Sequence, residues 1–178
     1  MHTRLNILLV GLVIGLTLGG CGVQASGQPL TFRSLAQDSI LRSDPKDETS
    51  VIRIIASSQE IDQLIHEFGD PPPLQLAPQL VEQLRQLDYM RYFAVLVTQG
   101  QKESLGFKVT VQQITRQDDQ VTVQAEFVGP KPGEGQPAVV FDPYHLVAVS
   151  KDGSWGRQMQ FELIANGKVA TKTAHFIP

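Results

Sequence analysis

The stretch GFKVTVQQITRQDDQVTVQAEFV, residues 106–128, decides the kind of fold that the sequence predicts. Apolar residues occupy every second position on both sides of its centre, namely Phe107, Val109, Val111, Val121, Val123, Ala125 and Phe127. Successive side chains of a strand point to opposite faces of a sheet, so each half presents one apolar and one polar face. The central RQDDQ has the composition of a turn. The stretch therefore predicts a β-hairpin with one buried and one solvated face.

Further strands are expected on both sides of this hairpin. The segments VIRIIAS (51–57) and YFAVLVTQ (92–99) are apolar at nearly every position, which is typical of strands buried on both faces. Residues 31–41 are expected to hold a strand or two, and residues 138–149 a strand that follows a Pro/Gly loop. Near the C-terminus, MQFELI and KVATKTAHF flank Asn166-Gly167, which favours a hairpin because both turn residues tolerate positive φ.

Two helices are expected in the middle of the chain. The apolar residues of 58–68 recur at the spacing of one helix face, namely Ile61, Leu64, Ile65 and Phe68. Ser57 and Glu60 fit a capping box at its start. A second helix is expected at about 78–87, where Pro78 suits the first turn. Because no βαβ alternation runs through the chain, we predict an α+β fold, a mostly antiparallel sheet with two helices packed on one face.

The composition excludes several classes of protein. The chain has 178 residues, 42% of them hydrophobic and 19% charged, which is a globular balance. A formal charge of -3 without a basic block argues against a nucleic-acid partner, because such binding depends on Lys and Arg. The single Cys rules out an intramolecular disulfide and a Cys-rich metal site.

The N-terminus indicates where the protein resides. MHTRLN precedes the 12-residue apolar run ILLVGLVIGLTL, which has the length of a signal-peptide core and is too short to span a membrane. The following Leu18-Gly19-Gly20-Cys21 resembles a bacterial lipobox. This resemblance implies cleavage before Cys21 and attachment of a diacylglycerol to its thiol. We therefore expect a signal peptide over 1–20, a lipidated Cys and tether over 21–30, and one domain over 31–178, in a lipoprotein anchored in the bacterial envelope and facing the periplasm or the cell exterior.

The sequence contains only weak candidates for catalytic or metal-binding residues. His145 lies three residues after Asp142, a spacing that places the two on opposite faces of a strand unless Pro143 breaks it. No Ser or Cys in a recognisable nucleophile motif accompanies them, and we expect no enzyme activity. His66 is expected on the wet face of the first helix, far in sequence from the other histidines, so we expect no metal and no cofactor.

Four residues form the candidate interaction surface. They are Tyr89, Tyr144, His145 and Trp155. Aromatic residues that stay exposed often mark a protein interface, although burial of Trp155 against the C-terminal hairpin is the simpler expectation.

Three stretches, DYMRYFAVLVTQGQKESLGFKVTV, QVTVQAEFVGPKPG and FDPYHLVAV, follow one another over residues 88–149. Their order resembles the PrcB-like C-terminal domain family, which is named for a lipoprotein subunit of a spirochaete surface protease complex. The Gly106-Phe107 strand start and the strand beginning at Pro143 carry the resemblance, whereas Leu105 stands where the family usually has a second Gly.

The resemblance implies a protein-interaction function. It favours a non-catalytic accessory or stabilising subunit of an envelope protease complex, with a protein partner and a membrane contact through the lipid. A small-ligand or cell-wall-binding lipoprotein is the alternative, and a hydrolase is a distant third. The matching residues are of structural type, so the resemblance assigns no functional residue.

Overall fold

The computed structural model describes residues 27–41, 49–69, 78–131, 133 and 137–178, which form ten strands and two helices. The helices are α1 (Gln59–Gly69) and α2 (Pro78–Arg85). The strands are β1 (Gln28–Pro29), β2 (Phe32–Leu41), β3 (Val51–Ile55), β4 (Tyr92–Thr98), β5 (Lys102–Ser104), β6 (Lys108–Gln117), β7 (Gln120–Val128), β8 (Ala138–Ser150), β9 (Arg157–Ala165) and β10 (Lys168–Ile177).

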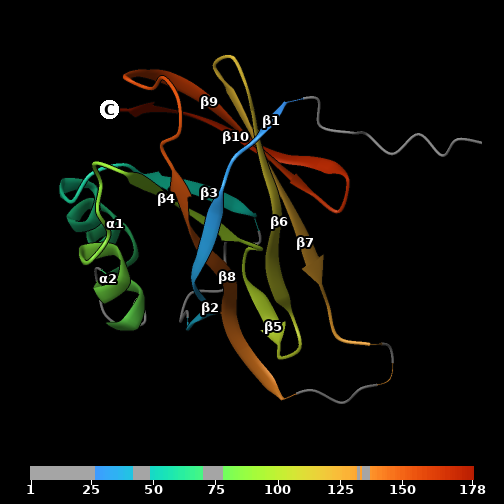
Figure 1. Ribbon diagram of the computed structural model, residues 1–178. Helices are drawn as coiled ribbons and strands as arrows, with labels where there is room; N and C mark the ends of the chain where they lie inside the picture. The colour runs from blue at the N-terminus through green and yellow to red at the C-terminus, as the bar shows by residue number, and fades with distance from the viewer. Residues whose placement is uncertain (1–26, 42–48, 70–77, 132, 134–136) are drawn as a thin grey trace, which may run out of the picture.

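The described elements stack in three layers, two sheets and one layer of helices (Figure 1). Sheet A has the strand order β1-β6-β7-β9-β10. Sheet B has the order β2-β8-β4-β3, and β5 pairs with the beginning of β8. Figure 1 shows α1 and α2 on the face of sheet B that points away from sheet A. Sheet B is therefore covered on both faces.

The predicted α+β class is wrong, because strand residues far outnumber helical ones and the fold is mostly β. The expected single sheet is in fact two facing sheets. The strand pairing is antiparallel as expected except between β7 and β9, which run parallel. The sequence could not distinguish one sheet from two. A strand that is apolar at every position indicates that both its faces are covered, but not whether a helix or another sheet covers each face.

Strands β4 and β8 lie at the centre of sheet B and supply two hydrophobic cores. Phe93, Val95 and Val97 of β4 belong to the core between the two sheets. Ala94 and Leu96, on the opposite face of the same strand, belong to the core under the helices. The prediction that residues 92–99 form a strand buried on both faces is thus confirmed. Alternation along one strand distributes its side chains between two layers.

The local elements predicted from the sequence are confirmed. The 106–128 stretch forms the hairpin of β6 and β7. The C-terminal hairpin of β9 and β10 turns at Asn166 and Gly167, whose φ angles are 49° and 79°. Both helices lie close to their expected positions. One cap differs, because the Glu60 carboxylate accepts a hydrogen bond from the main-chain N–H of Ala56 (2.8 Å) rather than of Ser57.

The folded part begins earlier than the expected boundary at residue 31. Strand β1 pairs Gln28 and Pro29 with Arg116 and Thr115 of β6. The next residue, Leu30, is only 7% exposed and contributes to the core between the sheets. The last residues of the expected tether over 21–30 therefore belong to sheet A.

Four strand pairings of the described sheets contain a register shift, and two of these shifts lie beside the same histidine. The register between β2 and β8 shifts between Ser34 and Ala36. The register between β6 and β7 shifts between Val111 and Gln113. A bulge bends its strand and re-aims the groups beside it. Both bulges are contacted by the same side chain, that of His145 on β8.

Candidate functional site

The imidazole of His145 joins β2, β6 and β8. Its Nδ1 accepts a hydrogen bond from the main-chain N–H of Val111 (2.9 Å), and its Nε2 lies 2.9 Å from Oγ of Ser34. The residue is 5% exposed. Since Ser34 and Val111 each flank a bulge, the side chain of His145 connects two of the irregular points of the sheets.

The direction of these hydrogen bonds decides what the Ser34–His145 contact can do. A serine hydroxyl beside an imidazole nitrogen is the first contact of a hydrolytic dyad. The Val111 N–H can only donate, so Nδ1 carries no proton and the neutral ring has its proton on Nε2. Nε2 therefore donates to Ser34 Oγ, whereas a general base would accept the serine proton there. The imidazole is held in the tautomer that does not activate Ser34.

His145 does not pair with Asp142. The two side chains lie three positions apart on the continuous strand β8 and so on opposite faces. The actual partner, Ser34, lies 111 positions away in the sequence. Burial lowers the pKa of His145, and Lys108 lowers it further, so that both effects favour the neutral ring.

The candidate interaction residues are not on one surface. Tyr144 is 1% exposed and belongs to the core under the helices, which corrects its expected position on a surface. Burial, with a contribution from Asp38, raises the pKa of Tyr144 to about 12. His145 is also buried, as described above. Tyr89 is half-buried, and its hydroxyl donates a hydrogen bond to the main-chain oxygen of Leu84 (3.0 Å).

Trp155 packs at the margin of the other core. Its ring contacts Phe93 edge-on, with the centroids 5.3 Å apart, and the guanidinium of Arg116 lies 4.1 Å from its centroid. Its Nε1 donates to the main-chain oxygen of Asp152 (3.1 Å). The residue is half-buried between a core aromatic ring and a cation, which accounts for its position without a partner.

The expected lipid site and one histidine cannot be placed. Cys21, the whole expected signal segment and the side chain of His66 lie outside the described residues. Within the described ranges, no three His, Cys, Asp or Glu residues are arranged to hold a metal ion. None of the helices that the structure describes is long and apolar enough to cross a membrane.

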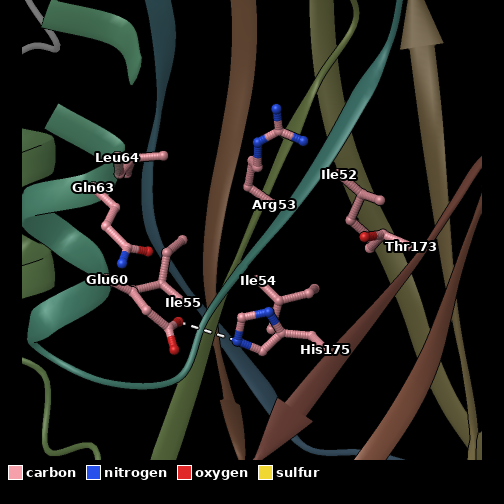
Figure 2. A pocket seen from close by; sticks show the side chains of 9 residues that line it. All are labelled: Ile52, Arg53, Ile54, Ile55, Glu60, Gln63, Leu64, Thr173 and His175. Carbon is pink, nitrogen blue, oxygen red and sulfur yellow. Dashed lines mark hydrogen bonds and ion pairs between the residues drawn. The ribbon is translucent and has the colours of Figure 1, made fainter. Parts of the chain in front are cut away.

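An open groove of about 180 Å³ follows β3, the edge strand of sheet B (Figure 2). Gln63 and Leu64 of α1 line one wall, and Thr173 of β10 lines the other. The floor is residues 52–55 of β3. The three isoleucines of this floor are at most 7% exposed, whereas Arg53 between them is half-buried and its side chain also lines the groove.

One hydrogen bond bridges the two walls of this groove. Glu60 Oε2 of α1 lies 3.1 Å from Nε2 of His175 on β10. In Figure 2 the guanidinium of Arg53 points away from this pair. The same Glu60 oxygen accepts the Ala56 N–H, so this carboxylate fixes the end of β3 to both walls. The sequence did not predict this groove, because its walls are more than 100 residues apart in the chain.

The structure thus defines a mostly β domain of two facing sheets with helices on one side. Comparison with known families adds that residues 93–150, from β4 through β8, match the model described as PrcB C-terminal. This confirms the resemblance seen in the sequence over about a third of the chain. The match suggests a domain associated with a protease complex. No curated protein and no solved structure shows a significant match.

Proposed function

We propose that the chain is a lipid-anchored, non-catalytic accessory subunit that faces the periplasm or the cell exterior and binds a protein of an envelope protease complex. The observation that carries this proposal is the match of residues 93–150 to the PrcB C-terminal family. The tautomer of His145 supports a non-catalytic role, because it cannot take the proton of Ser34. The sequence Leu18-Gly19-Gly20-Cys21 after an apolar run supports the lipid anchor.

The groove along β3 is the docking surface that this function favours. Every second residue of an edge strand turns its N–H and C=O groups away from the sheet, and an extended partner segment can add to them as a further strand. Polar groups on both walls, from Gln63 and Thr173, can bind side chains of such a segment.

A pair of neighbouring variants tests the docking surface. Thr173→Arg places a long cation in the groove, whereas Ala174→Arg places the same side chain on the opposite face of β10, where Ala174 is exposed. We expect a protease subunit, identified by mass spectrometry, to co-purify from detergent-solubilised membranes with the wild type and Ala174→Arg, and to be lost with Thr173→Arg. Equal recovery with both variants would reject the groove, and the absence of any protease subunit would reject the proposed function.

Substitution of the only cysteine tests the anchor. In Cys21→Ser, we expect the loss of labelling by a clickable palmitate analogue, together with either release from the membrane or accumulation of the uncut precursor. Ser26→Ala, five positions later, serves as the matched control and should retain label and processing. A wild-type protein whose intact mass shows no acyl groups would contradict the lipid anchor.

A further inference from the structure

The main-chain groups that β3 offers to the groove belong to two of its residues. The N–H of Gln99, directly after β4, donates to the main-chain oxygen of Pro143 on β8 (3.1 Å). Because successive residues of a strand bond to opposite neighbours, the odd-numbered residues of β4 bond to β8 and the even-numbered ones to β3. These even-numbered residues stand opposite the odd-numbered residues of β3. Ile52 and Ile54 therefore turn their N–H and C=O groups away from β4 and into the groove.

A contact at the end of β3 agrees with this assignment. Ala56 follows Ile54 at the same spacing, and its N–H donates to Oε2 of Glu60 on α1 (2.8 Å). The same oxygen lies 3.1 Å from Nε2 of His175. The carboxylate thus takes the place of a carbonyl group of a neighbouring strand. A partner segment can pair with Ile52 and Ile54 but cannot continue past Ala56.

The two walls decide which side chains such a segment can carry. Ile52 and Ile54 face the core between the sheets, so the residues opposite them turn toward β10 and Thr173. Arg53 lies on the other face of β3, which the helices cover, and lines the groove together with Gln63 of α1. The residue of the segment opposite Arg53 therefore has its side chain between the guanidinium and α1.

The charge at this position favours an acidic side chain. A guanidinium presents several N–H donors, so a contact that Arg53 makes within the chain leaves donors for a carboxylate of the partner. In Figure 2 this guanidinium points away from Glu60, whose carboxylate would repel another one. Arg53 is also half-buried, so an ion pair at this position is less screened by water than one on an open surface.

We propose that the groove binds an extended segment of the partner protein in which an acidic residue stands between two uncharged ones. The acidic residue lies opposite Arg53, and its neighbours lie opposite Ile52 and Ile54. The main chain of the segment adds to the edge of sheet B as a further strand. The acidic side chain fixes the register, because a shift by one residue would turn it toward β10. This inference rests on the proposed docking of a partner protein in the groove and adds the chemistry of the segment that docks.

Fluorescence anisotropy with the full-length, detergent-solubilised protein tests the inference. The probe is a fluorescein-labelled peptide of sequence SVEVS with an amidated C-terminus, which reads the same in both directions. One comparison peptide is SVQVS, which lacks the carboxylate. The other is SVEVS with both valines N-methylated, which lacks the N–H groups that would donate to β3. We expect saturable binding of SVEVS, about fivefold weaker binding of SVQVS, and no binding of the N-methylated peptide.

Variants of Arg53 connect the preference for the acidic peptide to this side chain. Arg53→Gln should bind SVEVS and SVQVS equally, whereas Arg53→Lys keeps the positive charge and should keep the preference. Arg91→Gln, which removes a charge from an exposed turn outside the groove, is the matched control and should bind as the wild type does. An unchanged preference in Arg53→Gln would overturn the proposal.

The peptide measurement and the pull-down separate this inference from the proposed function. Absence of saturable SVEVS binding, or equal binding of the N-methylated peptide, would overturn the inference even where a protease subunit co-purifies with the protein. Saturable binding of SVEVS that depends on Arg53, together with no protease subunit in the pull-down, would reject the proposed function and support the acidic specificity of the groove.

Discussion

At the scale of the single residue, His145 links the stability of the protein to pH. Its folded-state pKa is lowered, first by burial and then by Lys108, below the value of about 6.5 expected in the unfolded chain. Above pH 6.5 the ring is neutral in both states and the stabilisation is complete. As pH falls below 6.5, the unfolded chain takes up a proton first, so the free energy of unfolding decreases.

We therefore predict that the free energy of unfolding falls between pH 6.5 and pH 5, with a contribution from His145 of at most about 1.4 kcal/mol per pH unit. Urea unfolding at several pH values measures this slope. His145→Gln should be less stable at pH 8 because it cannot satisfy both Ser34 and Val111, but its slope should be smaller. Gln158→Ala, which replaces an exposed and uncharged side chain of β9, is the control and should retain the wild-type slope. An equal slope in His145→Gln would contradict the assignment.

The His145 contacts also show what a residue pattern does and does not reveal. The sequence shows this histidine without a recognisable nucleophile motif. It offered no signal for Ser34, because the two residues are brought together only by pairing of β2 with β8 and by the bulge beside Ser34. The prediction that Tyr144 and His145 lie on an interaction surface was wrong for a related reason. Side chains on both faces of β8 are covered by other parts of the protein.

At the scale of the element, Asn166 joins two strands that run in parallel. Its Oδ1 accepts the N–H of Phe127 and its Nδ2 donates to the oxygen of Phe127, both at 2.9 Å. Its main-chain N–H bonds to the oxygen of Ala125 (3.1 Å). The side-chain amide thus acts as a peptide group and extends the β7–β9 ladder, which ends at Ala125 and Ala165, by one step.

We predict that Asn166→Asp destabilises the protein by about 1 kcal/mol, because a carboxylate cannot donate to the oxygen of Phe127. Asn166→Gly keeps a residue suited to positive φ but loses both side-chain hydrogen bonds to Phe127. A similar loss of stability in this variant would assign the effect to these hydrogen bonds rather than to the turn. Thermal unfolding measures both. Lys168→Gln in the same hairpin is the control and should change stability by less than about 0.5 kcal/mol. Wild-type stability in Asn166→Asp would disprove the bridge.

At the scale of the whole molecule, sheet B is shared by two cores. Leu146 of β8 is fully buried under the helices, and its neighbour Val147 is fully buried between the sheets. A substitution that disrupts one core must therefore also disturb β8, which contributes side chains to the other core. A domain of this size is expected to unfold in one cooperative step.

We predict that Leu146→Ala lowers the free energy of unfolding by about 2–5 kcal/mol. The single tryptophan, Trp155, reports on the core between the sheets, on the far side of sheet B from Leu146. Its fluorescence midpoint in urea should nevertheless shift together with the far-ultraviolet circular dichroism midpoint. Leu105→Ala, at a site 40% exposed, should leave both midpoints nearly unchanged. Separate midpoints in Leu146→Ala would show that the helix layer unfolds independently.

The sequence by itself determined the local elements of this protein. The hairpin of residues 106–128, the turn at Asn166-Gly167 and the helices α1 and α2 each depend on contacts between residues close in the chain. Periodicity and turn chemistry report such contacts directly. The family resemblance over β4 to β8 was also visible, because it depends on the same local order of strands and turns.

Only the tertiary structure decided that the strands form two sheets, that β7 and β9 run parallel, and that Tyr144 and His145 are buried. It alone also placed Ser34 beside His145 and β10 beside α1. The physical reason is that alternation specifies which side chains share a face of a strand, whereas the layer that covers this face comes from distant segments. The groove along β3 lies at an edge of sheet B, where such distant segments meet.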